Sequence, residues 1–522
     1  MIFSSGFADN LKEMQRVAKK ISVFLFFGLL AFPISTFCQV DTAWVRHYNG
    51  TGDKTDFMLS SAIDDSGNSI VTGVSGYNWS TWDLVTIKYD RNGNQLWRQN
   101  YTGVQPVQGA SRCLTLEKNG SIFVTGGRGA SCFTLKYDSN GNRLWEALYS
   151  STAAFGRGVT TDEKGNVYVT GTSGFYPNYD YLTIKYDSNG NQQWASIFNK
   201  GQNYNEQSYL LVPDKNGNVY VSGYSENGTS QAGEAEWITI KYDSLGNRLW
   251  MKPFSTWQGA NWGAPGDMKL DALGNVYLAG GCQDSGTTLS YATIKYDPDG
   301  NQLWVARYRG RPDAYDFARA LVLDSNANAY VTGSSYGDGT TVMDIATIKY
   351  DSSGNQLWIQ RYNGPSNGND EGSSIAVDSA ENVYLAGESR GIDSALNYVI
   401  LKYDSSGNFL WEKRHEGSVD FVGSEIFSID RNGNLHLSGT DTQNAYDFVT
   451  IKYSPLPTLK GDLNLDGILT MADVVLMLNF TFNGTPFPAA PSAGDLNCDG
   501  KISPTDVVIM LQIFFLAVSP PC

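Results

Sequence analysis

The stretch ATIKYDSSGNQLW at residues 346–358 decides the fold, because close copies stand at residues 85–97 (VTIKYDRNGNQLW) and 292–304 (ATIKYDPDGNQLW). Repetition at a period near fifty residues is typical of propellers. Three strand-like runs, 60–65, 69–73 and 84–90, precede the tryptophan of one copy, so each repeat predicts one four-stranded blade. The tryptophan recurs every 48 to 56 residues, at Trp44, Trp97, Trp145, Trp194, Trp250, Trp304, Trp358 and Trp411.

The repeat count predicts how the ring closes. The repeats begin with a lone tryptophan strand, TAWVRHY at residues 42–48, and end with FVTIKYS at residues 448–454, which no tryptophan strand follows. Because these fragments complete one blade, the sequence predicts an all-β, eight-bladed β-propeller over residues 39–454, with the last blade closed by the N-terminal strand. Closure removes an open sheet edge that would otherwise invite aggregation.

Tight turns punctuate each blade. In YDRNGNQLW, Asp90 can accept hydrogen bonds from backbone N–H groups two residues on, and Gly93 supplies the left-handed conformation of a type I turn with a bulge. Ala327 and Glu381 replace such a glycine in two copies. These turns faintly resemble calcium loops, but they lack a carboxylate at the twelfth position, so we interpret them as structural turns.

The N-terminus is typical of an export signal. Basic residues up to Lys20 precede the apolar run 21–32, and small residues then permit cleavage before Gln39. We expect residues 1–38 to be a signal peptide and the mature protein to be secreted, extracellular or at the cell surface, with no membrane span after cleavage. A retained membrane anchor is the alternative. The net charge of -15 and the absence of a basic stripe disfavour a nucleic-acid partner.

Export permits disulfides. Cys113, Cys132 and Cys282 fall in or beside predicted strands, so we expect them in the core. Cys498 and Cys522 are candidates for a bridge that would pin the C-terminus.

The C-terminal tail carries a duplicated calcium loop. After a proline-bearing linker at residues 455–460, the segments DLNLDGILTMAD (462–473) and DLNCDGKISPTD (495–506) repeat with an offset of 33 residues. Their oxygen-bearing side chains and central glycine match the spacing of EF-hand-like loops, in which position 7 gives only its backbone carbonyl. The predicted ligands are Asp462, Asn464, Asp466, Ile468, Thr470 and Asp473, and then Asp495, Asn497, Asp499, Lys501, Ser503 and Asp506.

Two family resemblances follow from these motifs. The phrases GNVYVTG (165–171) and IAVD (375–378) make residues 40–454 resemble bacterial secreted beta-propeller repeat (SBBP-like) proteins. Residues 461–522, a pair of loops that each lead into a helix-like apolar segment, resemble a type I dockerin. That resemblance implies two bound Ca²⁺ ions, a cohesin-type partner domain and assembly on a scaffold, commonly for polysaccharide breakdown.

The partner's identity stays open at this point. Cohesin recognition often uses Ser-Thr at positions 10 and 11 of each loop, whereas this chain has Met471–Ala472 and Pro504–Thr505.

The long connections between repeats contain aromatic residues that the repeat does not explain. Variable loops on a rigid scaffold commonly bind ligands, so we expect a carbohydrate or protein ligand on this face of the propeller; simple packing is the alternative. The residues are Trp79, Trp82, Phe175, Tyr176, Tyr179, Trp257 and Trp262.

The sequence offers no catalytic constellation. The three histidines have no metal-ligand spacing, and a G-x-S-x-G match at residues 333–337 lies between two predicted strands rather than before a helix. We therefore expect a non-catalytic binding and display module. The alternatives are a dockerin-targeted propeller enzyme, either a glycoside hydrolase with two facing carboxylates or a quinoprotein-like enzyme, and a purely structural surface protein.

Overall fold

The computed structural model describes residues 40–50, 55–76, 82–105, 112–150, 153–201, 204–227, 234–258, 263–283, 289–311, 315–337, 342–392, 395–415, 419–420, 427–441, 446–455, 461–463, 469–485, 491–496 and 501–516. The chain divides into two compact units, Thr42–Ser454 and a smaller one that combines Met1–Asp41 with Pro455–Cys522. The predicted signal peptide and residues 456–460 of the predicted linker lie outside the described residues.

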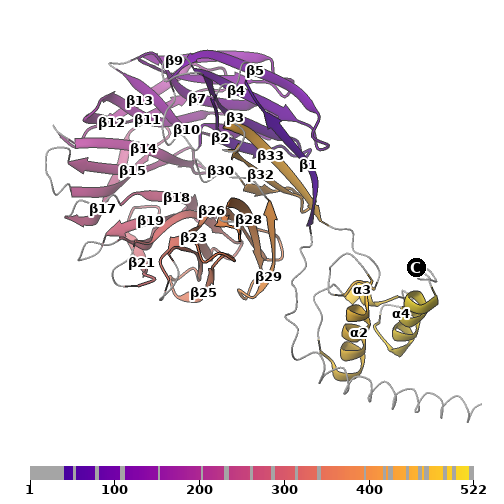
Figure 1. Cartoon of the computed structure of the whole chain (residues 1–522). Helices are drawn as coiled ribbons and strands as arrows, with labels where there is room; N and C mark the ends of the chain where they lie inside the picture. Colours follow the sequence, from indigo (N-terminus) through magenta and orange to yellow (C-terminus); the bar gives the residue numbers. More distant parts are fainter. Residues whose placement is uncertain are drawn as a thin grey trace, which may run out of the picture. The chain divides into compact units, whose positions relative to one another are not determined.

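Thr42–Ser454 is an eight-bladed β-propeller, which confirms the predicted fold class (Figure 1). The first four blades are β2 (Thr55–Ile63), β3 (Ser69–Gly76), β4 (Trp82–Tyr89) and β5 (Gln95–Val104); β6 (Leu114–Leu116), β7 (Ile122–Arg128), β8 (Ser131–Tyr137) and β9 (Arg143–Ser150); β10 (Ala154–Thr161), β11 (Val167–Phe175), β12 (Asn178–Tyr186) and β13 (Gln192–Phe198); and β14 (Tyr204–Pro213), β15 (Val219–Asn227), β16 (Glu234–Tyr242) and β17 (Arg248–Gln258).

The next three blades keep the same order of four strands. They are β18 (Pro265–Leu270), β19 (Val276–Gln283), β20 (Leu289–Tyr296) and β21 (Gln302–Tyr308); β22 (Phe317–Leu323), β23 (Ala329–Ser335), β24 (Asp344–Tyr350) and β25 (Gln356–Tyr362); and β26 (Asp370–Val377), β27 (Val383–Arg390), β28 (Leu396–Tyr403) and β29 (Phe409–His415).

The eighth blade joins the two ends of the propeller sequence. Its first strand position is split between β30 (Val419–Asp420) and β31 (Phe427–Ile429), which both pair with β32 (Leu435–Asp441). After β33 (Asp447–Pro455), the outer place is taken by β1 (Val40–Tyr48). Figure 1 shows indigo β1 beside orange β33, so the N-terminal strand closes the ring as predicted.

Consecutive antiparallel strands give the ring two different ends. The first-to-second and third-to-fourth strand connections share one end, here called the turn end, and include the D-x-x-G-N turns such as 351–355. The remaining connections share the other end, here called the long-loop end.

The turn chemistry explains part of the repeated phrase. Asp351 accepts hydrogen bonds from the backbone N of Ser353 and of Asn355, both at 2.9 Å. Gly354 has a φ of 89°, which favours glycine. A Cβ at Gly354 would also lie 2.7 Å from the Trp304 ring of the preceding blade. Glycine is therefore needed both for its backbone conformation and for the close approach of the neighbouring indole.

The tryptophan and the lysine of the repeated phrase connect one blade to the next. Their two hydrogen bonds to one backbone oxygen of the next blade are here called the latch. Trp304 Nε1 and Lys295 Nζ donate to the same backbone oxygen, that of Ser352, at 3.1 and 3.0 Å. Seven interfaces between described blades carry this pair of donors, with oxygens of Arg91, Ser139, Ser188, Ser244, Pro298, Ser352 and Ser405 as acceptors. The phrase repeats because each copy builds half of a contact that the next copy completes.

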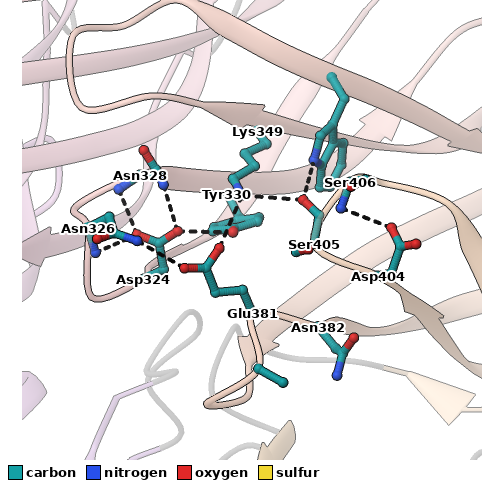
Figure 2. A network of polar contacts seen from close by, with 12 residues as sticks. Asp324, Asn326, Asn328, Tyr330, Lys349, Glu381, Asn382, Asp404, Ser405 and Ser406 are labelled. Atoms are coloured by element: carbon teal, nitrogen blue, oxygen red, sulfur yellow. Dashed lines mark hydrogen bonds and ion pairs between the residues drawn. The ribbon is translucent and has the colours of Figure 1, made fainter. Parts of the chain in front are cut away.

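Figure 2 shows one latch together with the neighbouring turns. Lys349 Nζ donates to the Ser405 oxygen at 3.3 Å and forms an ion pair with Glu381 at 3.6 Å. Asp324 accepts from the hydroxyl of Tyr330 at 3.0 Å, and Asn326 donates to Glu381 at 2.9 Å. Lys349 in the third strand of the sixth blade thus contacts both turns of the seventh blade, and Asn326 in the first turn of the sixth blade contacts the first turn of the seventh.

The interface between the seventh and eighth blades lacks this latch. Pro455 stands where the other blades have the acceptor residue, but β33 extends through this position instead of turning. Trp411 is 1% exposed, and its Nε1 has no acceptor among the described residues. Lys402 lies over the Tyr384 ring, 4.8 Å from its centroid, and burial lowers the pKa of its ammonium group.

A buried ion pair ties non-adjacent blades together. Arg112, which precedes β6, donates to Asp267 of β18, three blades further on. Asp267 also accepts from the backbone N of Leu321 in the sixth blade at 3.0 Å. Both charged side chains are almost fully buried, so this contact helps to fill the centre of the ring.

The smaller unit is helical in its described part. It contains α2 (Met471–Asn483), α3 (Pro491–Gly494) and α4 (Pro504–Leu516). Its core consists of Leu463, Val474, Met477, Ala493, Leu496, Val507 and Met510. Within the described residues, no helix has the length and apolarity needed to cross a membrane.

Candidate calcium loops and ligand-binding face

The first predicted calcium loop is closed by its last residue. The Asp473 carboxylate accepts from the backbone N of Leu463 at 2.8 Å and from the backbone N and hydroxyl of Thr470 at 2.9 and 3.1 Å. Thr470 is also the N-cap of α2 and forms a capping box with Asp473. One carboxylate therefore links the start of the loop to the start of the helix.

The second loop repeats this geometry. The Asp506 carboxylate accepts from Leu496 N at 2.8 Å and from the backbone N and hydroxyl of Ser503 at 2.9 and 3.1 Å. The loop-to-helix joints thus match residue for residue at an offset of 33. Gly461 N donates to Ala493 O at 2.9 Å, which connects the start of one loop to the approach of the other.

Seven of the twelve predicted ligands lie within the described residues. Asp462, Asp473 and Asp506 are buried, whereas the Lys501 side chain is exposed. An exposed Lys501 fits a position that gives only its backbone oxygen. Asn464, Asp466, Ile468, Asn497 and Asp499 lie outside the described residues, as do Cys498 and Cys522.

The predicted ligand set suits a hard cation. Carboxylate, amide, hydroxyl and backbone oxygens are the ligands that Ca²⁺ takes, and the set contains no sulfur or imidazole. Among the described residues, no group of three His, Cys, Asp or Glu side chains could hold a metal. Asp466 and Asp499, the remaining carboxylate of each loop, lie outside the described residues.

The aromatic residues predicted on the long-loop end differ in their exposure to solvent. Trp82 is 3% exposed and packs against Phe57 with ring centroids 5.9 Å apart, so its prediction as a binding platform is wrong. Phe175 and Tyr176 are 66% and 73% exposed at the tip of the β11–β12 hairpin, and Tyr179 is partly buried. Trp79, Trp262 and the side chain of Trp257 lie outside the described residues.

Other sequence candidates are structural. Ser335, the central serine of the G-x-S-x-G match, is buried at the end of β23 and accepts from Arg361 at 2.8 Å. Cys113, Cys132 and Cys282 are buried, as predicted. Sequence reasoning missed Glu206, whose carboxyl group has its pKa raised to about 7, first by burial.

The fold and the duplicated loops define a repeat propeller joined to a small loop-helix module. The beta-propeller repeat model matches residues 149–177, 304–339 and 357–392, and the dockerin type I domain model matches residues 460–514. Both matches confirm the resemblances drawn from the sequence.

Other similar proteins support the architecture alone. An uncharacterized WD repeat-containing protein of Acanthamoeba polyphaga mimivirus is 25% identical over 490 residues, which cover 81% of this chain and 32% of that protein. This chain thus spans about a third of the length of that relative. The crystal structure of Sqt1 from Chaetomium thermophilum aligns with a TM-score of 0.51 at 11% identity, covering 80% of this chain and 99% of the other.

Proposed function

We propose that the protein is a secreted, non-catalytic propeller that binds and displays a ligand and is attached through a calcium-dependent dockerin to a cohesin-bearing or cell-surface assembly, in the service of polysaccharide degradation. The observation that carries this proposal is the identical closure of two loops by Asp473 and Asp506, in a segment that matches the dockerin model.

Calcium is expected to control the fold of this module. Each loop gathers three carboxylates, and like charges in a small loop repel when no cation offsets them. The described core of the unit has seven buried apolar residues with six partly buried ones packed against them, a small core for a fold of about sixty residues. Metal binding should therefore supply much of the folding free energy.

The test uses the full chain and a panel of cohesin domains. The double variant Asp473→Ala, Asp506→Ala should lose calcium binding by titration calorimetry and lose calcium-dependent capture by cohesin. The control is Lys501→Ala, which removes only an exposed side chain and should bind as the natural chain does. Capture by cohesin that persists in chelator, or in the double variant, would contradict the proposal.

Glu206 is the strongest candidate for an acid–base residue, and its contacts support the non-catalytic part of the proposal. Glu206 Oε1 accepts from the backbone N of Lys200 at 3.0 Å, and the side chain is fully buried. In three other blades an aspartate likewise accepts from the backbone N six residues earlier. These are Asp56 (2.6 Å), Asp316 (2.8 Å) and Asp370 (2.6 Å). This recurrence indicates a structural role for Glu206. Hydrolysis of any polysaccharide, abolished by Glu206→Gln, would overturn that conclusion.

A further inference from the structure

The β11–β12 hairpin presents a rigid aromatic tip. Its ladder runs unbroken to the pair Phe175–Asn178, so only Tyr176 and Pro177 form the connection. Phe175 and Tyr176 are the most exposed aromatic side chains among the described residues. A projecting, fully paired hairpin that holds two aromatic rings in water marks an interaction site.

Other tyrosines continue from this tip into the neighbouring blade. The ring centroid of Tyr176 lies 6.4 Å from that of Tyr179, edge to face, so Tyr179 supports the exposed ring. Burial raises the pKa of Tyr224 in β15 to about 12, and both Tyr176 and Tyr179 are near enough to act on it. Tyr209 of β14 lies a further 6.4 Å from Tyr224 between ring centroids. These four tyrosines, 176, 179, 224 and 209, are called the tyrosine row.

The charges around the tyrosine row have both signs. Burial lowers the pKa of the Arg157 guanidinium group in β10, and Tyr224, Tyr179 and Tyr209 of the row oppose that shift. Glu226 also acts on Tyr224, and Asp180, the residue after Tyr179, has its pKa raised by burial. Donors and acceptors therefore stand together next to the aromatic rings, an arrangement that fits a ligand with many hydroxyl groups and no net charge.

We propose that the tyrosine row and Phe175 bind a neutral glycan chain, with one sugar ring stacked on Tyr176 and the next units running toward Arg157. The apolar face of a pyranose ring complements an aromatic face, and its hydroxyl groups suit the phenols, the guanidinium group and the carboxylates. This inference rests on the proposed function and names the ligand class of the same face.

The exposed area disfavours a protein as the occupant. Two aromatic rings that are about two-thirds exposed offer roughly 300 Å². A stable protein interface buries about 800 Å² on each partner. A single sugar ring or two is the better match to this size.

The experiment probes the full chain, with calcium, on an array of neutral glucans, xylans, mannans and galactans, together with uronate-containing glycans. Titration calorimetry with the best neutral oligosaccharide then compares variants. Tyr176→Ala and Phe175→Ala should each weaken binding by about tenfold or more, and Tyr176→Trp should retain it. The matched control is Leu245→Ala, a 76% exposed apolar residue in the β16–β17 turn at the turn end, which should change nothing.

Each other outcome overturns the proposal in a recognisable way. Failure to bind any neutral glycan at millimolar concentration, a preference for uronates, or equal binding by Tyr176→Ala and the natural chain rejects the site or its ligand class. Loss of a protein partner on Tyr176→Ala rejects the glycan while leaving the display function intact. Because cohesin capture depends on the calcium loops, it reports separately on the proposed attachment, and Tyr176 variants should leave both capture and melting temperature unchanged.

Discussion

The open latch at the last interface gives a sharp test of how the repeated tryptophan stabilises the ring. Trp358 donates to Ser405 O at 3.2 Å, whereas Trp411, at the equivalent place one blade later, has no acceptor among the described residues. Replacing either with phenylalanine removes the same atoms. Only Trp358→Phe breaks a hydrogen bond.

Removing the indole N–H group has opposite effects on the free energy of unfolding at the two positions. Losing the Trp358 bond costs about 1 kcal/mol, since Ser405 O keeps its bond from Lys349. Removing the unpaired, buried N–H of Trp411 relieves about 1–3 kcal/mol of desolvation. The loss of ring contacts opposes this gain and is larger at Trp411, which is the more buried of the two. Trp358→Phe should therefore lower the free energy of unfolding by about 1–2 kcal/mol, and Trp411→Phe should leave it nearly unchanged.

Calorimetry of the full chain in calcium measures both changes, and tryptophan-selective ¹⁵N labelling measures the cause. The indole N–H resonance that disappears in Trp411→Phe should show the chemical shift of a group without an acceptor. The reasoning is refuted if Trp411→Phe destabilises the ring as much as Trp358→Phe does, or if the Trp411 resonance resembles that of Trp358.

Two further predictions concern residues that depart from the repeat. Ala327 holds a φ of 61°, so Ala327→Gly should raise the free energy of unfolding by about 0.5–1 kcal/mol, and Gly274→Ala, at the same turn one blade earlier, should lower it; thermal melts of both give the sign. His436 takes the place of a repeat tyrosine, and its pKa is lowered to about 4, first by burial. Because the unfolded chain binds this proton near pH 6.5, stability should fall by about 3 kcal/mol between pH 6.5 and 4. His436→Phe should flatten that part of the melting profile, and an unchanged profile would contradict the assignment.

The sequence was enough to predict the ring because its signals are local and periodic. The spacing of tryptophans gave one blade per repeat, and aspartate and glycine at fixed offsets specified the turns. The lone strand around Trp44 and the missing partner after 448–454 gave the closure. The spacing of oxygen-bearing residues predicted the calcium loops in the same way, and the described joints at Asp473 and Asp506 repeat as that pattern requires.

What the sequence could not give are contacts between distant repeats. Nothing local indicates that Trp304 donates to Ser352 in the next blade, or that Arg112 meets Asp267 across 155 positions. Trp82 looked like a loop residue because it follows a polar segment, but β4 begins at Trp82 and carries it into the core. The predicted strand began at residue 84, so a difference of two residues at a strand end separates a buried ring from an exposed one.

The open latch and the proposed ligand site lie at different ends of the ring. β33 is the third strand of its blade and runs as the third strands of the other seven blades do, so Pro455 lies at the turn end, where β1 also begins. The exposed tip of the β11–β12 hairpin is a second-to-third strand connection and therefore lies at the long-loop end. The open latch at Trp411 and the aromatic tip that we propose as a ligand site therefore lie at opposite ends of the ring.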